Sequence, residues 1–544
     1  MRRRLWLSVA MAALGAALLV AAGFASPAQS GTAAAKAKRG GTLKLNMSAT
    51  DVDFSDPSLA YGVQSWQLEY STALKLYNYP DARAPLGSQI RPEAATGFPK
   101  VTNSGRTYTI HIRKGLRLSN GAHVTAANFA KAINRTLSKT MQAPGATFIQ
   151  NIVGAQKVID GKASKASGVV ARGQTLTIKL TQPDGGMLAK LGMPFFQALA
   201  LNIPTNSHGV NTYPSGGPYY FASRSVGRQI VLKRNRYYHG KRPANADTMI
   251  INVNTNVDQS LLQVRRGEVN YDLGGLPASA PAQLAKDFGV NKGRFFVNQL
   301  VETDYVALNT SRPTFGQLAL RKAANFAVDR PAMLRQRGAY AGKRTDQILP
   351  PGMGGFHDVK VYPIQGSNYA KAKSLAGNKC GSIRLDTTTS AVGQALGQVL
   401  KFNFTQMGCN VNIKLFQGFQ LYVADGTKGE PFDAAIAGWN QDYPDPYDFI
   451  DILLNGQNIH AANNNNLAYL NVPKINRLMA AANKKIGPAR YRAYGNLDIL
   501  LTKSYAPWAA YDNRNVREFV SAKTGGYIFQ PANASADLNT LYIK

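Results

Sequence analysis

Residues 380–416 read CGSIRLDTTTSAVGQALGQVLKFNFTQMGCNVNIKLF, and this stretch decides the fold class. Segments typical of strands stand at its two ends, residues 383–389 and 411–416. Between them, apolar side chains recur at helical spacing and form one face, which ends before Gly408. These side chains are Val392, Ala395, Leu396, Val399, Leu400 and Met407. A strand, a helix and a second strand in this order predict a βαβ unit with two parallel strands.

The chain has two cysteines, Cys380 and Cys409, and each lies just before one of these two strands. If the strands are neighbours, about 4.8 Å apart, the two Cα atoms fall within the roughly 4.4–6.8 Å that a disulfide requires. We therefore predict a structural disulfide between Cys380 and Cys409. Two unpaired, buried thiols are the alternative.

Strand and helix patterns also alternate over the rest of the chain. Residues 43–47, 108–113 and 176–180 alternate apolar and polar side chains as strands do. One helix is predicted to begin at a Thr125 cap, and another to run from Asp258 to a glycine C-cap at Gly267. We expect a mixed α/β fold. Because a single hydrophobic core stops growing at about 250–300 residues, 544 residues predict at least two lobes.

The first residues have the composition of a secretory signal. Three arginines at residues 2–4 precede an uncharged run from Leu5 to Ala25, and small residues follow. We expect the protein to be secreted across the cytoplasmic membrane. The uncharged run is also long enough to span a bilayer of about 30 Å, so an uncleaved anchor is the alternative for residues 1–39.

The chain is strongly basic. Residues 1–39 hold six of the 63 lysines and arginines and no acid, so the remainder carries 57 bases against 30 acids, a net charge of +27. Such a charge favours anionic partners. The bases form no long run with interleaved aromatic residues, so we do not predict nucleic-acid binding. An anionic surface of the cell envelope is the expected partner of this charge.

Motifs of catalysis are absent from the sequence. It contains no Gly-x-Ser-x-Gly elbow, His-Glu-x-x-His helix, phosphate-binding loop or Cys-x-x-Cys pair. The six histidines do not stand at helical ligand spacing, and the acids of residues 442–451 lack the alternation of a calcium loop. We predict no catalytic residue, no metal site and no cofactor.

Residues 438–449, GWNQDYPDPYDF, gather acids and aromatic rings directly after an apolar strand. Asp445 before Pro446 predicts a helix N-cap, and Asp448 suits a first turn. This explanation leaves out Asp442 and its neighbours Trp439 and Tyr443. Ligands in α/β lobes bind at the carboxyl ends of strands, where a carboxylate among aromatic faces pairs strongly with an ammonium. Packing of Trp439 and Tyr443 in the core is the alternative.

Several segments, taken in order along the chain, resemble one family. They are residues 40–44 (GGTLK), 106–121 (RTYTIHIRKGLRLSNG), 124–129 (VTAANF), 215–221 (SGGPYYF), 233–238 (KRNRYY), 308–310 (LNT), 328–330 (VDR) and 438–446 (GWNQDYPDP). From Gly40 to the C-terminus, the chain resembles the extracytoplasmic solute-binding proteins of the peptide and nickel ABC-transporter family, solute-binding protein family 5.

The resemblance implies an α/β, type II periplasmic-binding-protein-like fold, with two lobes joined by a hinge and an extra subdomain in the first lobe. Lobe I is then expected at residues 40–85, 206–300 and 509–544, the inserted subdomain at 86–205, and lobe II at 301–508. Lobe closure over a ligand is the expected motion.

The resemblance also implies a function. We expect a non-catalytic substrate-binding component of an ABC importer, a monomer, that captures a small solute, most often a short peptide, and delivers it to a membrane permease. The same fold binding an oligosaccharide, an opine-like conjugate or a metal chelate is the alternative. Outside the family, an envelope interaction or chaperone-like protein is the competing hypothesis.

The ligand-binding residues follow from matching positions. In peptide-binding relatives the aspartate at the position of Asp442 pairs with the α-ammonium of the ligand. Trp439, Asn440 and Tyr443 flank it and are candidates for the pocket wall. Trp66 and Tyr61 lie where the first lobe is expected to face the cleft, and core packing is the alternative for them.

This sequence departs from the family pattern at three places. Many relatives carry a lipobox cysteine, whereas Phe24 follows Ala21-Ala-Gly here, so we expect no lipid anchor through such a cysteine. Asn120 and Asn128 stand where the family has aspartates. We interpret both as surface or capping positions within a generally basic chain.

Overall fold

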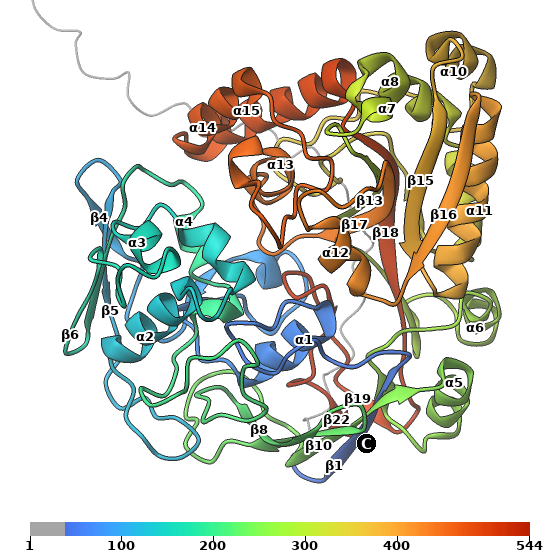
Figure 1. The fold of residues 1–544 in the computed structure, drawn as a ribbon. Coiled ribbons are helices and arrows are strands. Elements are labelled where there is room, and N and C mark those ends of the chain that lie inside the picture. The colour runs from blue at the N-terminus through green and yellow to red at the C-terminus, as the bar shows by residue number, and fades with distance from the viewer. Residues whose placement is uncertain (1–37) are drawn as a thin grey trace, which may run out of the picture. The chain divides into compact units, whose positions relative to one another are not determined.

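The computed structural model describes residues 38–544, and these residues form one compact unit (Figure 1). The predicted signal or anchor falls in residues 1–37, outside the described part of the chain. Within residues 38–544, every helix is too short or too polar to cross a membrane. Strands and helices are mixed along the whole unit, as predicted.

A five-stranded sheet contains the first strand of the described chain, in the order β11-β1-β10-β9-β8. Leu43, Leu45 and Met47 of its strand β1 are fully buried, which confirms the alternation seen in the sequence. Helix α1 (Val63–Thr72) follows this strand, and α5 (Val257–Arg266) packs beside it. The strands are β1 (Thr42–Ser48), β8 (Tyr219–Ser225), β9 (Gln229–Arg234), β10 (Thr248–Thr255) and β11 (Tyr271–Asp272).

A seven-stranded mixed sheet forms the largest layer, with the order β12-β18-β13-β17-β15-β16 and β14 paired to β18. Strand β18 runs from this sheet towards the five-stranded sheet, where Val520 bridges Tyr271 of β11. The strands are β12 (Phe295–Gln299), β13 (Glu302–Leu308), β14 (Gly342–Arg344), β15 (Gly381–Thr388), β16 (Cys409–Phe416), β17 (Ala434–Asn440) and β18 (Trp508–Phe519).

The predicted βαβ unit is confirmed. Strands β15 and β16 pair in parallel with Gly381 opposite Cys409, and helix α11 (Ala391–Gln406) connects them. Leu396 and Leu400 of the predicted helix face are buried against the sheet. The register brings the Cα atoms of Cys380 and Cys409 to 4.9 Å, and the two residues form the predicted disulfide.

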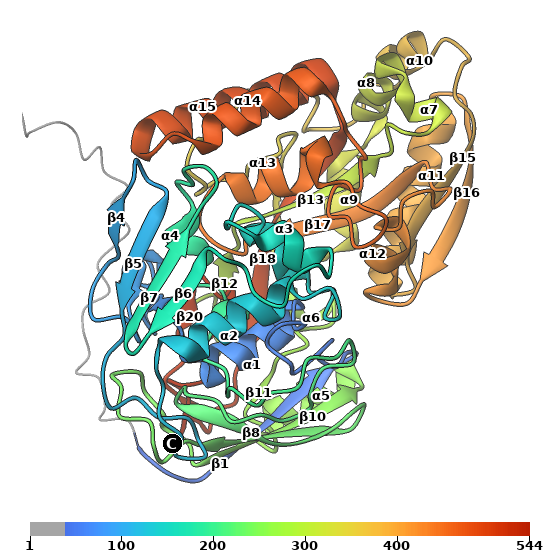
Figure 2. The same cartoon turned by 60° about the vertical axis from the view of Figure 1, so that its left-hand side comes forward.

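A four-stranded antiparallel sheet, in the order β4-β5-β7-β6, lies apart from the other two (Figures 1 and 2). Helix α2 (Ala126–Leu137) packs against one of its faces. Thr125 caps this helix as predicted, and Asn128 completes the cap from a buried position, so it is a capping residue and is not on the surface. The strands are β4 (Lys100–Thr102), β5 (Thr107–His111), β6 (Val169–Arg172) and β7 (Thr175–Lys179).

Further helices cover the sheets, and α14 and α15 pack together beside α13 (Figure 2). The helices are α3 (Ala155–Ile159), α4 (Met187–Lys190), α6 (Ala280–Phe288), α7 (Pro313–Gly316), α8 (Leu318–Ala327), α9 (Arg330–Gln336), α10 (Tyr369–Ala376), α12 (Gln420–Asp425), α13 (Tyr447–Leu454), α14 (Pro473–Asn483) and α15 (Gly487–Leu500). Short pairs complete the strands: β2 (Tyr77–Asn78) with β3 (Arg91–Pro92), β19 (Thr524–Gly525) with β22 (Tyr542–Ile543), and β20 (Phe529–Gln530) with β21 (Ser535–Ala536).

Candidate functional site

The loop that carries Asp442 connects strand β17 to helix α13 (Figure 1). Strand β17 is paired with β13 on one side and β15 on the other, and residues 434–437 are buried. The chain leaves the sheet after Asn440, and α13 begins at Tyr447. The acids of residues 442–451 are therefore presented at the carboxyl end of an interior strand, the place where α/β folds bind ligands.

Two of these acids have structural partners. Both carboxylate oxygens of Asp445 accept hydrogen bonds from Arg490, at 2.8 and 2.9 Å, in a buried ion pair. The predicted N-cap was one residue early, because Pro446 occupies the cap position, although Asp445 still accepts the amide of Tyr447. The carboxylate of Asp451 accepts the hydroxyl of Tyr494 at 2.7 Å.

Asp448 is fully buried and holds the loop in place. Its Oδ2 atom accepts the backbone amide of Asp442 at 2.8 Å and the indole N–H of Trp439 at 3.4 Å. Burial, and then the negative charge of Asp442, raise the pKa of Asp448 well above its usual value. The sequence predicted Asp448 only in a first helical turn, and its contact with Asp442 arises because the loop folds back on the helix.

Asp442 meets a residue that is distant in the sequence. Its Oδ2 atom accepts the hydroxyl of Tyr61 at 2.6 Å. Tyr61 lies directly before α1, and its backbone is fixed because Asp53 accepts the amides of Tyr61 and Gly62, each at 2.8 Å. The contact therefore joins the segment between β1 and α1 to the loop that follows β17 of the seven-stranded sheet.

Aromatic rings surround this hydrogen bond. The ring centroid of Tyr61 lies 5.6 Å from that of Trp66, 6.1 Å from Trp439 and 5.5 Å from Phe195. Phe148 completes the group at 6.5 Å. Trp66 is oriented by its indole N–H, which donates to the carbonyl of Ala60 at 2.8 Å. The carboxylate of Asp442 thus lies beside an aromatic wall that excludes water on one side.

Burial raises the pKa of Asp442 to about 7, against the hydrogen bonds from Tyr61 and Asp448, which lower it. The same burial, together with the charges of Asp442 and Asp448, raises the pKa of Tyr61, so its hydroxyl stays protonated and donates. The carboxyl group of Asp442 therefore changes its charge near neutral pH. A cationic group placed against it would favour the charged form.

The predicted site residues fall into two groups. The structure brings Tyr61, Trp66 and Trp439 together around Asp442. Tyr443 is fully buried, with its ring 6.1 Å from that of Phe148, and its hydroxyl has no hydrogen-bond partner in the described part of the chain. The side chain of Asn440 donates to the carbonyl of Gln441 at 3.3 Å.

Sequence reasoning missed three residues of this site: Asp53, Phe148 and Phe195. It placed Asp448 correctly in the first turn of α13, but it did not predict the hydrogen bond from the amide of Asp442 to Asp448. No local pattern marks Phe148 or Phe195, because both lie in apolar surroundings that are typical of a core.

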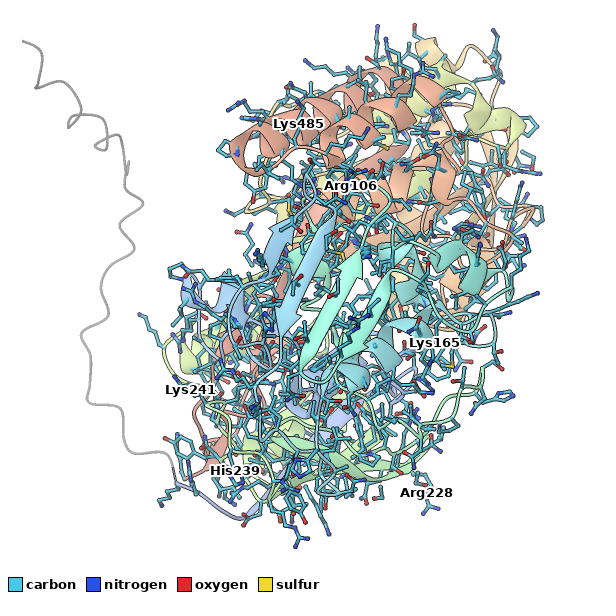
Figure 3. All side chains as sticks on the ribbon, turned by 90° about the vertical axis from the view of Figure 1, so that its left-hand side faces the viewer. Arg106, Lys165, Arg228, His239, Lys241 and Lys485 are labelled. Atoms are coloured by element: carbon cyan, nitrogen blue, oxygen red, sulfur yellow. A yellow bond between two sulfur atoms is a disulfide. The ribbon has the colours of Figure 1, made fainter. Side chains whose placement is uncertain are left out.

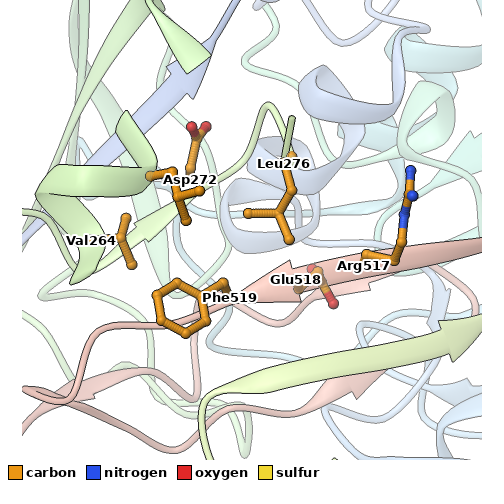
Figure 4. Close-up of a pocket in the computed structure, with 8 residues that line it drawn as sticks. Val264, Asp272, Leu276, Arg517, Glu518 and Phe519 are labelled. Atoms are coloured by element: carbon orange, nitrogen blue, oxygen red, sulfur yellow. The ribbon is translucent and has the colours of Figure 1, made fainter. Parts of the chain in front are cut away.

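A small cavity lies elsewhere, between α5, β11 and β18 (Figure 4). Its volume is roughly 10 Å³, about the space of one water molecule, and Leu276, Phe519 and Asp272 are among the residues that line it. Ligand pockets usually enclose about 300–1,000 Å³. This cavity is too small for a peptide, and it is separate from the site at Asp442. Across residues 38–544, no three metal-binding side chains converge.

Comparison with known proteins places the chain in a family. The model for the middle region of the bacterial extracellular solute-binding proteins, family 5, matches residues 89–461. The periplasmic oligopeptide-binding protein OppA of Haemophilus influenzae is 24% identical over 486 residues, which cover 84% of this chain and 86% of that protein. Heme-binding protein A of the same species is 23% identical over 477 residues and 82% of each chain.

Solved structures show the same fold. A clavulanic acid biosynthesis oligopeptide-binding protein 2 superposes with a TM-score of 0.84 at 21% identity, over 93% of this chain and 96% of that one. The binding protein AgaA of A. tumefaciens R10, solved with agropinic acid, superposes with a TM-score of 0.78 at 20% identity, over 93% and 99% of the two chains. The fold is thus the two-lobed, type II α/β fold that was predicted. This chain belongs to the bacterial extracellular solute-binding proteins of family 5.

Proposed function

We propose that this protein captures a short peptide outside the cytoplasmic membrane and delivers it to the permease of an ABC importer. A substrate-binding role follows from the family. The observation that carries the peptide proposal is the contact between Asp442 and Tyr61, a carboxylate inside an aromatic wall that draws together two distant parts of the chain. The OppA relative, which is named for binding oligopeptides, supports this choice of ligand.

The α-ammonium of the peptide takes the position of the Tyr61 hydroxyl on Asp442. An ammonium donates up to three hydrogen bonds, so it can satisfy a buried carboxylate better than one hydroxyl does. Trp439 and Trp66 flank this position and cover the first side chain of the peptide. Asn440 and Tyr443 belong to the wall. The Oδ1 atom of Asn440 is buried and has no hydrogen-bond partner within residues 38–544, so it can accept a donor of the ligand.

We assign the lobes as the sequence suggested. Lobe I comprises residues 40–85, 206–300 and 509–544, with an inserted subdomain at 86–205, and lobe II comprises 301–508. The five-stranded sheet and the four-stranded sheet fall in the first lobe and its insertion. Strand β18 starts at Trp508, the last residue of lobe II, and continues into lobe I, so this segment acts as part of the hinge. The bond between Tyr61 and Asp442 then spans the cleft of a closed form.

A different ligand is the second candidate. Two of the similar proteins are named for ligands other than peptides: heme-binding protein A, and AgaA in its complex with agropinic acid. An oligosaccharide, an opine-like conjugate or a metal chelate would use the same aromatic wall. In that case Asp442 would have no ammonium partner.

We further propose that the protein acts as a monomer, that it is not an enzyme, and that no lipid attached to a lipobox cysteine anchors it. Its position outside the cytoplasm rests on the family and on the predicted secretory signal at residues 1–39.

Native mass spectrometry of the purified protein, followed by denaturation and identification of the released molecules, tests the proposal. We expect a mixture of short peptides on the wild type and a strong loss of them on Asp442→Asn. Asp358→Asn, an exposed site that carries the same charge change, is the control and should keep the peptides. A sugar, a metal chelate or an unchanged set of peptides on Asp442→Asn would contradict the role of Asp442.

A further inference from the structure

One face of the four-stranded sheet is covered, and the opposite face is open. The residues that face α2 are buried, among them Tyr108, Ile110, Leu176 and Ile178. In Figure 1 helices α2, α3 and α4 all lie on that inner side. The residues that alternate with them project outward. We call this outer side of residues 100–102, 107–111, 169–172 and 175–179 the outer sheet face.

The outer sheet face combines basic side chains with threonines. The register places Lys100 opposite Thr109, Lys179 opposite Thr107, and Arg172 opposite Thr175. Lys100, Lys179 and Arg172 are exposed, and so is His111 beside them. The threonine row consists of Thr107, Thr109, Thr175 and Thr177. Each threonine offers a hydroxyl donor next to a cation, which suits an anionic oxygen.

The charge of this region is not neutralised by nearby acids. Residues 94–183 contain thirteen lysines and arginines and one acid, Asp160. Two of the thirteen have an acidic partner among the described residues: Arg135 forms a buried pair with Asp56, and Lys162 pairs with Asp160. The other eleven form no salt bridge in residues 38–544, so their field extends into solvent.

A second basic surface adjoins the sheet. Figure 3 looks onto the sheet, with Arg106 labelled at the upper end of the strands, Lys165 to one side and Lys485 above. Lys485 lies in the turn between α14 and α15, and the amide of Gly185 donates to the carbonyl of Asn483, the last residue of α14, at 3.4 Å. Residues 471–505 contain seven bases and one acid, Asp498, which is fully buried. Arg490 is buried against Asp445, and the other six bases add positive charge next to the sheet.

We propose that the outer sheet face binds a linear, phosphate-rich polymer of the cell envelope. A flexible chain of repeated anions can follow cations that are spread over a nearly flat sheet. Neighbouring strands lie about 4.8 Å apart, so each strand adds a further row of side chains at that spacing. His111 carries the one aromatic ring at the outward positions of the four strands, so the bases of a nucleic acid find no row of stacking partners there. The outward positions also lack long apolar side chains that would insert into a lipid surface.

This surface acts independently of ligand capture, because it lies on the side of the sheet away from α2 and not at Asp442. Binding would hold the protein near its importer while the cleft remains free. Binding releases condensed counterions from the polymer, and added salt reduces the free energy gained from that release, so the affinity must fall as the salt concentration rises.

The test measures binding of labelled long-chain inorganic polyphosphate to the full protein at several salt concentrations. The variant combines Lys100→Gln, Arg106→Gln, Arg172→Gln and Lys179→Gln. The control removes four equally exposed lysines of the region around α10 and α11, with Lys371→Gln, Lys373→Gln, Lys379→Gln and Lys401→Gln. All eight positions lie on the surface, and an unchanged thermal transition verifies the fold of both variants.

We expect the outer-face variant to lose at least tenfold in affinity, and its slope of log K against log salt to fall by about 0.7 for each cation removed. The control should change less than about twofold. Equal losses in both variants would show that net charge alone acts, and would overturn the proposal. Tighter binding of anionic vesicles or of single-stranded DNA through the same four residues, at equal phosphate concentration, would also overturn it.

Discussion

Asp442, Asp445, Asp448 and Asp451 recur every three residues, yet each carboxylate has a different partner. Asp445 pairs with Arg490 and Asp451 with Tyr494, both within the region of α13 and α15. Asp448 binds the backbone amide of Asp442. Asp442 alone reaches a side chain from the beginning of the described chain. The four evenly spaced aspartates therefore have different roles: three hold the local structure, and Asp442 is available for a ligand.

Removal of the Tyr61 hydroxyl should strengthen peptide binding. A hydrogen bond to a charged group contributes about 1.5–3 kcal/mol, and an incoming ammonium has to replace this one on Asp442. In Tyr61→Phe the ring and its aromatic contacts remain, while the competing donor is lost. We expect the dissociation constant for a short peptide to fall about tenfold, as measured by isothermal titration calorimetry.

Tyr443→Phe is the matched control, because the buried hydroxyl of Tyr443 has no partner among residues 38–544 and its loss leaves none of them unpaired. The affinity of this variant should stay within about twofold of the wild type. A weaker affinity of Tyr61→Phe would show that the hydroxyl stays on Asp442 when the ligand is bound.

The affinity for a peptide should rise with pH up to neutrality. The pKa of Asp442 in the ligand-free protein is about 7, because burial opposes its charge, and an ammonium stabilises the charged form. Binding therefore releases a proton below pH 7. Above about pH 8 the α-ammonium of the peptide loses its own proton, and the affinity falls again. Titration calorimetry in buffers of different ionisation enthalpy measures the proton release. Asp442→Asn should abolish the rising limb, and a flat profile in the wild type would contradict this account.

At the scale of elements, the sequence predicted what local patterns determine. The βαβ unit, the cap at Thr125 and the glycine end of α5 at Gly267 are confirmed. Two helix starts were placed wrongly: α5 begins at Val257 with Asn256 as its cap, one residue before the predicted start at Asp258, and Pro446 stands at the cap of α13 in place of Asp445. In both cases several polar or turn-forming residues are adjacent, and the tertiary position of the loop selects among them.

The disulfide should stabilise the pair of strands without affecting the ligand. Cys380 and Cys409 are separated by 29 residues, and closing a loop of this size in the unfolded chain is worth about 3–4 kcal/mol. The double variant Cys380→Ser and Cys409→Ser should therefore lower the free energy of unfolding by about 2–4 kcal/mol in denaturant titrations. Its affinity for a peptide should not change, because the bridge lies at the start of β15 and β16, away from Asp442. Two thiols titrating in the unfolded, unreduced wild type would contradict the bridge itself.

The aromatic part of the site was beyond local prediction. Trp439 and Asp442 stand together in the sequence, whereas Phe148 and Phe195 reach Tyr61 from other segments of the chain. Each is an apolar residue in an apolar stretch, so only the three-dimensional arrangement separates it from the core. The resemblance to a family supplied Tyr61 and Trp66, and periodicity did not.

At the scale of the whole molecule, many buried acids carry raised pKa values. Burial raises the pKa of Glu69 to about 8, and those of Asp451 and Asp498 to about 7. The folded protein therefore binds more protons than the unfolded chain between about pH 4 and pH 8. Under this condition the stability falls as pH rises.

We expect a higher midpoint of thermal unfolding at pH 5.5 than at pH 8.5, as measured by calorimetry at constant ionic strength. The excess of bases opposes this trend only at low pH, where the remaining carboxylates lose their charge. Glu69→Gln should reduce the difference between the two midpoints, because a glutamine side chain imitates the protonated form of Glu69 at every pH. A midpoint that rises steadily from pH 5.5 to pH 8.5 would contradict the assignment.

The central claim is that two lobes close on a peptide whose α-ammonium pairs with Asp442. Its most direct test is the titration of one tripeptide with a free N-terminus, and of the same peptide acetylated there, into the wild type and Asp442→Asn. Loss of one partner of a buried charge pair costs about 2–5 kcal/mol, so acetylation should weaken binding to the wild type by roughly 30-fold or more. It should change binding to Asp442→Asn little. Equal affinities of the two peptides for the wild type, or the same loss in both proteins, would contradict the claim.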